Sequence, residues 1–164
     1  MDVTMRSVEI PTCEMVTDLI GNYVHMLDDG NVGVWPEFFT VSGLYHVTTR
    51  ENYEQGLPIG IIRCVGRGMM TDRVKAFHTA NIFEPHCYNH LVGPAMIRGG
   101  RTPEAIASRC NFQIVRIMED GRTALFATGK YLDEIVLDGG VAKFKERVVV
   151  LDSRNVDTLI VLPL

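Results

Sequence analysis

The segment from Ser108 to Leu151 decides the fold, and it reads SRCNFQIVRIMEDGRTALFATGKYLDEIVLDGGVAKFKERVVVL. Two glycine-containing turns, Glu119-Asp120-Gly121 and Asp138-Gly139-Gly140, separate stretches that are rich in β-branched and aromatic side chains. Turns of this kind between apolar stretches are typical of β-hairpins. The expected strands cover residues 108–118, 122–132, 134–137 and 141–151. The segment therefore predicts a run of antiparallel strands.

Upstream of this segment the apolar residues have the spacing of a helix. They recur every four positions at Met15, Leu19, Tyr23 and Leu27, which places them on one helix face. Thr12 is suited to cap the start of this helix, and Asp29-Gly30-Asn31 to end it. Gly21 within the helix costs about 1 kcal/mol relative to alanine. Asp28 and Asp29 lie at the negative end of the helix dipole, where acidic side chains are mildly unfavourable. Either packing overrides both of these costs or the acids serve another purpose.

The remaining elements complete an α+β pattern. We expect a short helix or turn at residues 35–39, a strand at 44–49, an apolar candidate strand at 57–65, a helix at 69–81 with Arg73 and Lys75 facing outward, a strand at 86–97 interrupted by Gly93-Pro94, and a last strand at 159–162. Helices followed by a long antiparallel meander are typical of the α+β class. Such a sheet, strongly curved around its N-terminal helices, makes a cone with an apolar interior. The length favours a single domain over residues 1–164.

The end of the sequence, Asp157 to Leu164, is a hydrophobic run (DTLIVLPL) without a polar tail. An exposed run of this kind would be an adhesive sheet edge. We therefore expect a final strand that is buried on both faces or covered by a partner subunit. Burying about three of its apolar side chains would contribute roughly 5–9 kcal/mol. Truncation after Thr158 should therefore give aggregated or unassembled protein.

Composition excludes several classes of protein. Hydrophobic residues make up 46% and charged residues 22% of the 164 residues, which is typical of a globular chain. The formal charge is -4 and no Lys/Arg block occurs, which argues against nucleic acid as a partner. We expect no membrane span, because no apolar stretch approaches about 18 residues. We expect no secretory signal, because the residues from Met1 to Arg6 lack a basic segment followed by an apolar run. The four scattered cysteines indicate reduced thiols and a cytoplasmic protein.

Histidines and acids suggest two possible metal sites, and we expect neither to form. His86 and His90 would share an ion on a helix, but on a strand they lie roughly 13 Å apart. Asp72, His78 and His86 invite a two-histidine, one-carboxylate reading for non-haem iron. Nothing fixes these three residues on adjacent surfaces, and Pro85 interrupts the run.

Other chemically suggestive residues are better explained as structural. Cys64 and Cys110 have no nearby histidine that would mark a nucleophile, so we expect small core residues. Gly66-Arg67-Gly68 lacks the third glycine and the βαβ unit of a dinucleotide loop. The methionines at positions 69, 70, 96 and 118 are expected to fill the core.

One set of polar residues could line the interior of the cone and perform acid–base chemistry. Its members are Tyr45, His46, Tyr131, Asp133 and Glu146. Strand alternation places Tyr45 and His46 on opposite faces, so at most part of the set converges. We expect Tyr45 to pack in the core while His46 and Glu146 are solvated. No catalytic, cofactor-binding or metal residue is predicted.

Several phrases of the sequence share one order and spacing with a known family. They are Trp35–Thr40 (WPEFFT), Tyr45–Thr48 (YHVT), Asn52, Gly56–Pro58, Met70–Val74 (MTDRV), Phe83–His90 (FEPHCYNH), Tyr131–Asp133, Glu146-Arg147, Leu151–Ser153, Asp157–Leu159 and Leu162–Leu164. Together they resemble the β (small) subunit of aromatic-ring-hydroxylating dioxygenases, over nearly the whole chain. The resemblance is closest to oxygenases of aromatic carboxylates such as terephthalate, anthranilate or salicylate.

The resemblance implies a cystatin-like, or nuclear-transport-factor-2-like, cone and a hetero-oligomer with a large α subunit. That oligomer typically contains three copies of each subunit, with β–β contacts. The family's α subunit carries the Rieske 2Fe-2S cluster and the mononuclear non-haem iron, while the β subunit is mainly structural with some influence on substrate range. A Rieske centre needs two Cys and two His ligands, and the family pattern for them is Cys-x-His followed by Cys-x-x-His. Cys87-Tyr88-Asn89-His90 matches only the second half, so no catalytic residue is transferred.

Two other classes of function remain open. The first is a stand-alone cone-fold isomerase or dehydratase that uses Tyr45, His46 or Asp133 as acid or base. The second is a non-catalytic module that binds a small hydrophobic ligand. A convergent polar group inside the cone with a raised carboxylate pKa would favour the enzyme.

Overall fold

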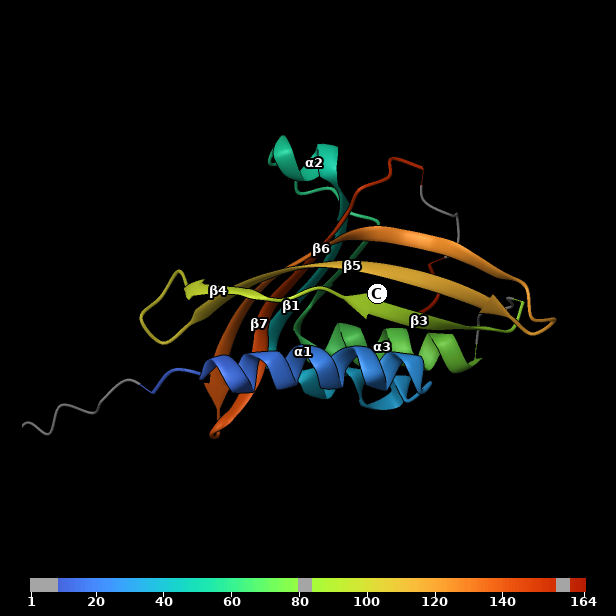
Figure 1. The fold of residues 1–164 in the computed structure, drawn as a ribbon. Coiled ribbons are helices and arrows are strands. Elements are labelled where there is room, and N and C mark those ends of the chain that lie inside the picture. The colour runs from blue at the N-terminus through green and yellow to red at the C-terminus, as the bar shows by residue number, and fades with distance from the viewer. Residues whose placement is uncertain (1–8, 80–83, 156–159) are drawn as a thin grey trace, which may run out of the picture.

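A strongly curved sheet wraps around one long helix in the computed structural model, which describes residues 9–79, 84–155 and 160–164 (Figure 1). The helices are α1 (Cys13–Asp28), the 3-10 helix η1 (Val32–Phe38), α2 (Arg50–Glu54) and α3 (Gly66–Thr79). The strands are β1 (Phe39–Thr49), β2 (Ile62–Val65), β3 (His86–Val92), β4 (Met96–Gly99), β5 (Ile106–Met118), β6 (Thr123–Asp138) and β7 (Val141–Leu151). The α+β class expected from the sequence is confirmed.

The sheet is built around the two predicted hairpins. Its strand order is β2-β1-β7-β6-β5-β3, and β4 pairs with β5. β1 runs parallel to β7, and each of the other pairs is antiparallel. The two strands expected at 122–132 and 134–137 are one continuous strand, β6. Its pairing with β7 changes register between Glu134 and Ile135, close to the predicted break.

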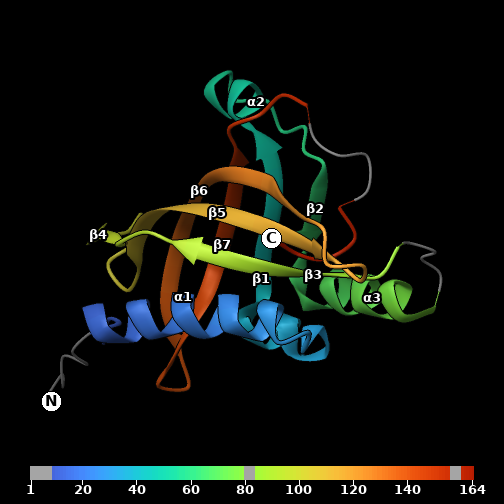
Figure 2. The ribbon, with the colours of Figure 1, turned by 45° about the vertical axis from the view of Figure 1, so that its right-hand side comes forward.

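Helix α1 fills the concave side of the sheet (Figures 1 and 2). Thr12 caps it as predicted, because its Oγ1 accepts a hydrogen bond from Met15 N at 3.2 Å. Gly30 follows the helix in the left-handed region, with φ of 74°, a conformation that favours glycine. The apolar face packs into the core against β3 and β7. None of the helices in the described part of the chain is long and apolar enough to cross a bilayer.

Helix α3 begins three residues earlier than the predicted helix at 69–81, and it is described as far as Thr79. Gly66-Arg67-Gly68 forms its first turn. Lys75 faces solvent as expected, but the prediction for Arg73 is wrong. The Arg73 side chain is partly buried because its Nη2 donates a hydrogen bond to the main-chain oxygen of Ile160 at 2.8 Å.

The strand predicted over residues 57–65 forms only in its last part, as β2 from Ile62. The preceding residues instead run past the end of β1, where Ile61 N donates to Val47 O at 2.7 Å. Gly60 lies so close to His46 that a Cβ at position 60 would be 2.2 Å from His46 Nε2. This close approach shapes an irregular segment rather than a longer strand.

The last residues of the chain are buried, but they do not form the predicted strand. Ile160, Val161, Leu162 and Leu164 are each at most 8% exposed, which confirms the predicted burial. Residues 160–162 have no strand conformation, and Leu159 lies outside the described residues. The strand prediction fails because the main-chain groups of this segment form hydrogen bonds with side chains rather than with a neighbouring strand. Leu164 N donates to the Tyr45 hydroxyl at 2.8 Å, for example.

Candidate functional site

Side chains fill the interior of the cone where the expected apolar cavity would be. The largest fully buried side chains include Trp35, Tyr23, Tyr45, Tyr131, Phe39, Phe144 and Arg147. Their rings pack mostly edge to face, as between Trp35 and Tyr45, whose centroids are 4.9 Å apart. Leu162 and Leu164 are part of the same cluster. Packing of this kind makes a rigid core.

An ion pair lies at the centre of this core. Arg147 Nε and Nη2 each donate to the Asp133 carboxylate at 2.8 Å, and both side chains are 0% exposed. The guanidinium carbon lies 4.0–4.2 Å from the ring centroids of Tyr23, Tyr131 and Phe144. Burial alone would lower the pKa of Arg147, but the Asp133 carboxylate outweighs it and raises that pKa. Asp133 is therefore held as the partner of a permanent cation.

The five polar residues proposed from the sequence divide between the two faces of the sheet. Tyr45, Tyr131 and Asp133 are buried in the interior, as strand alternation predicts for part of the set. Burial raises the pKa of Tyr45 and Tyr131 well above the ordinary value, which keeps these phenols protonated. They are suited to donate hydrogen bonds rather than to act as bases.

His46 and Glu146 lie on the other face and are partly buried, so the expected solvation is only partly met. Burial, and then the Arg63 charge, lower the pKa of His46. Glu146 Oε2 accepts a hydrogen bond from Arg101 Nη2 at 2.5 Å. The two residues therefore cannot join the interior group in acid–base chemistry.

Asp28, which is partly buried, and His90, whose side chain is fully buried, form a pair that sequence reasoning missed. The two carboxylate oxygens of Asp28 accept from His90 N at 3.2 and 3.0 Å, and Asp28 Oδ1 lies 2.5 Å from His90 Nδ1. This pair explains the acid at the unfavourable end of α1. His90 Nε2 has no hydrogen-bond partner in the described structure. The misplaced acid was the available signal, but nothing in the sequence pointed from it to His90.

The possible metal ligands are not brought together. Among residues 9–79, 84–155 and 160–164, no group of three or more His, Cys, Asp or Glu side chains could hold a metal ion. Asp72 instead pairs with Lys75 at 3.7 Å on the surface of α3. Cys64 and Cys110 are buried free thiols. Burial raises the pKa of both, that of Cys110 to about 11, so neither is an activated nucleophile.

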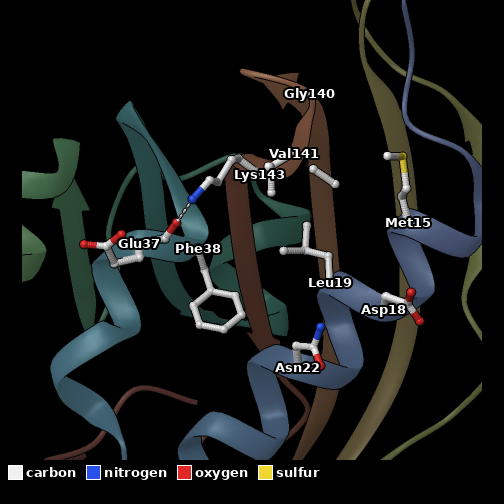
Figure 3. Close-up of a pocket in the computed structure, with 10 residues that line it drawn as sticks. Met15, Asp18, Leu19, Asn22, Glu37, Phe38, Gly140, Val141 and Lys143 are labelled. Atoms are coloured by element: carbon white, nitrogen blue, oxygen red, sulfur yellow. Dashed lines mark hydrogen bonds between the residues drawn. The ribbon is translucent and has the colours of Figure 1, made fainter.

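A surface groove of about 480 Å³ opens where α1, the end of η1 and the β6–β7 turn meet. Figure 3 shows Phe38 and Leu19 facing one another across its floor. Charged residues form the rim, and Lys143 Nζ donates to the main-chain oxygen of Glu37. An apolar floor with a polar rim is suited to binding rather than to proton transfer. The sequence did not predict this groove because its lining comes from three separate segments.

Comparisons with known proteins agree with this geometry. A family model described as the ring hydroxylating beta subunit matches residues 23–158. The chain is 40% identical over 142 residues to subunit beta 2 of the terephthalate 1,2-dioxygenase terminal oxygenase component of Comamonas sp, covering 87% of this chain and 92% of that one. It is 33% identical over 146 residues to the anthranilate 1,2-dioxygenase small subunit of Burkholderia cepacia, covering 89% and 90%.

A solved structure is similar over nearly the same extent. It is the β subunit of a candidate aromatic-ring-hydroxylating dioxygenase from Novosphingobium aromaticivorans. The TM-score is 0.82 with 32% identity, and the match covers 92% of this chain and 95% of the other. The cone fold expected from the sequence is therefore confirmed.

Proposed function

Because the chain belongs to the ring-hydroxylating β-subunit family, we propose that it is the mainly structural, non-catalytic small subunit of an oxygenase that acts on an aromatic carboxylate. The substrate class rests on the relatives named for terephthalate and anthranilate. The observation that carries the structural role is the filled cone, with the Arg147–Asp133 pair at its centre. A stand-alone isomerase or dehydratase would need an open interior with a free acid or base.

The cofactors of the reaction would lie in the partner α subunit. This chain has half of a Rieske motif, Cys87-x-x-His90, but the geometry does not fit a cluster. Cys87 is exposed, whereas the His90 side chain is 0% exposed and bound by Asp28. Residues three apart on one strand point to opposite faces, so the two could not close on one iron. We propose that the Rieske cluster and the mononuclear iron are held by the α subunit alone.

The partner would be a large α subunit, in a trimer of αβ pairs with β–β contacts. Exposed apolar side chains between α2 and β2 support the proposal that a partner subunit covers this part of the surface. Leu57, Ile59 and Ile61 are 39%, 62% and 44% exposed, and α2 projects from one end of the sheet (Figure 1). Exposed apolar side chains that gather into one surface mark protein contacts, and these three lie within five residues of one another in the sequence. The proposal also treats residues 1–164 as one domain and places the protein in the cytoplasm. The four free thiols support the cytoplasmic location, because cysteines stay reduced there.

Co-expression with the cognate large subunit tests this proposal. We expect one co-eluting complex that oxidises an aromatic carboxylate when an electron donor is supplied. Elemental analysis after dissociation should assign iron to the large subunit and sub-stoichiometric iron and zinc to this chain. One tightly held iron per copy of this chain would contradict the non-catalytic assignment.

A further inference from the structure

We propose that the outer face of the sheet docks onto an acidic, partly apolar surface of the large subunit through the cations Arg98, Arg109 and Lys130. The inference rests on the proposed function and assigns the face that the partner covers. In Figures 1 and 2, α1 and α3 lie on the inner side of β5 and β6, while α2 stands at one end of the outer side. Between α2 and β4, no helix of the described chain covers this outer face.

Two adjoining hollows of about 440 and 590 Å³ lie on this face, and Arg109 lines both of them. The alternation of side chains along the strands decides which residues line them. Arg109 on β5 and Lys130 on β6 point outward, because Cys110 and Tyr131, their neighbours in sequence, are buried in the core. Strand β4 adds Arg98 to the same face. Three strands therefore bring their cations to one surface.

The carboxylates that line the hollows already have arginine partners. The pairs are Glu134 and Glu146 with Arg101, Asp152 with Arg50, and the buried Asp133 with Arg147. In contrast, Arg98, Arg109 and Lys130 form no ion pair with any residue in the described ranges. The face therefore has three uncompensated positive charges, on a chain whose formal charge is -4.

Two of these cations are placed unfavourably in the free chain. Asn111 pairs with Lys130, and Arg109 pairs with Leu132, so Lys130 and Arg109 are diagonal neighbours on one face of the sheet. Long side chains at diagonal positions reach each other, and like charges that face across a sheet are destabilising. A partner that brings carboxylates to this place removes the repulsion and gains charge-assisted hydrogen bonds. Carboxylates are therefore the chemistry that this part of the face selects.

The rest of the face has the composition of a protein interface. Tyr53, Leu91 and Met96 line the hollows and are 45%, 68% and 54% exposed. Tyrosine, methionine and arginine are enriched in interfaces, and tyrosine and arginine also among the residues that dominate binding. Tyr53 lies on α2, four residues before the exposed apolar segment that begins at Leu57. One partner can therefore cover both surfaces.

The charge of the face also decides between two occupants. A second copy of this chain, docked on the same face by a two-fold contact, would bring the same cations against each other. Like charges that meet in an interface suppress binding. The occupant is therefore the large subunit, with carboxylates opposite Arg109 and Lys130.

The test compares two variants of the full chain that change the net charge by the same amount. Arg109→Glu with Lys130→Glu reverses the proposed surface, and Lys75→Glu with Arg122→Glu reverses two exposed cations elsewhere. Charges at an interface act strongly on the association rate and its salt dependence. At low salt, the first variant should associate with the cognate large subunit about tenfold more slowly than the wild-type chain, and with less dependence on salt. The control variant should associate at the wild-type rate.

A second measurement uses the wild-type chain, so it decides the matter even if the reversed variant does not fold. Brief acetylation followed by mass spectrometry should modify Lys130 more slowly in the complex than in the free chain. Lys75, which is exposed on α3, should react equally in both.

The outcomes separate this inference from the proposed function. If the complex forms but the reversed variant associates at the wild-type rate, or Lys130 is not protected, the inference is wrong and the proposed function stands. If the wild-type chain forms no complex, both are wrong. If reversing these cations changes the oligomeric state of the isolated chain, the face joins copies of this chain, which also overturns the inference.

Discussion

Arg147 and Asp133 face each other across the β6–β7 pairing and form a two-point ion pair at 2.8 Å that is completely withdrawn from solvent. Three aromatic rings surround the guanidinium, and Ser108 Oγ donates to Asp133 Oδ2 at 3.3 Å. The pair therefore joins three strands of the sheet to the aromatic core. Its place is structural, because both charges are already committed to each other.

Removing one partner of this pair should destabilise the chain strongly. Asp133→Ala leaves an uncompensated buried guanidinium and should lower the free energy of unfolding by about 3–5 kcal/mol, measured by urea denaturation. The double change Asp133→Leu with Arg147→Met should recover much of that loss. Asp72→Ala, which removes an exposed pair with Lys75, is the control and should have no measurable effect. Equal losses in the single and double variants would contradict this account.

The pairing of Asp28 with His90 predicts a sharp contrast between two neighbouring acids. Asp28→Ala deprives His90 N and Nδ1 of their shared acceptor and should cost about 1–3 kcal/mol in the free energy of unfolding. Asp29→Ala changes an exposed residue at the same helix end and should have little effect. Thermal denaturation of the two variants compares them directly. Equal melting temperatures would show that the Asp28–His90 contact contributes nothing.

The buried tyrosines predict loss of stability at alkaline pH. Burial raises the pKa of Tyr45 and Tyr131 well above 10 and that of Tyr23 to about 12. In the unfolded chain tyrosine loses its proton near about 10. The unfolded state therefore binds fewer protons above that pH, and the free energy of unfolding falls as pH rises.

Phenolate absorbance and circular dichroism, followed together from pH 9 upward, would measure this behaviour. Ionisation of these three phenols should coincide with unfolding, and Tyr131→Phe should remove one phenolate from that step. Complete tyrosine ionisation in a chain that is still folded would contradict the prediction.

Two glycines should respond to alanine in opposite directions. A Cβ at Gly21 would meet no atom within 4 Å, and alanine favours the helix by about 0.5–1 kcal/mol, so Gly21→Ala should raise the melting temperature. A Cβ at Gly129 would lie 2.2 Å from Val150 O and 2.9 Å from Phe112 Cζ. Gly129→Ala should therefore cost about 1–3 kcal/mol, as overpacking does. Differential scanning calorimetry would detect both shifts, and shifts of the same sign would contradict the packing described.

Local signals account for what the sequence predicted correctly. Helix α1 has a capping threonine and four-residue periodicity, and both hairpins have glycine turns, with Gly121 and Gly139 in the left-handed region. These signals act between residues that are close along the chain, so composition and spacing are enough to recognise them.

The errors arise where a residue's partner is distant in the sequence. The backbone of Leu164 bonds to side chains more than one hundred residues away, at Tyr23 and Tyr45, so an apolar run that suggests a strand forms none. Asp28 and His90 are 62 residues apart, and no periodicity links them. Arg73 turns inward because Ile160 offers it an acceptor.

The most direct test of the central claim is a titration of this purified chain into its cognate large subunit, with oxygen consumption on terephthalate and related aromatic carboxylates as the readout. We expect no oxygen consumption from this chain alone. When it is added to the large subunit, the rate of oxygen consumption should rise and saturate at one copy per large subunit, with the iron content of the mixture unchanged. Aromatic oxidation by this chain alone, or a large subunit whose assembly and activity do not respond to it, would contradict the account.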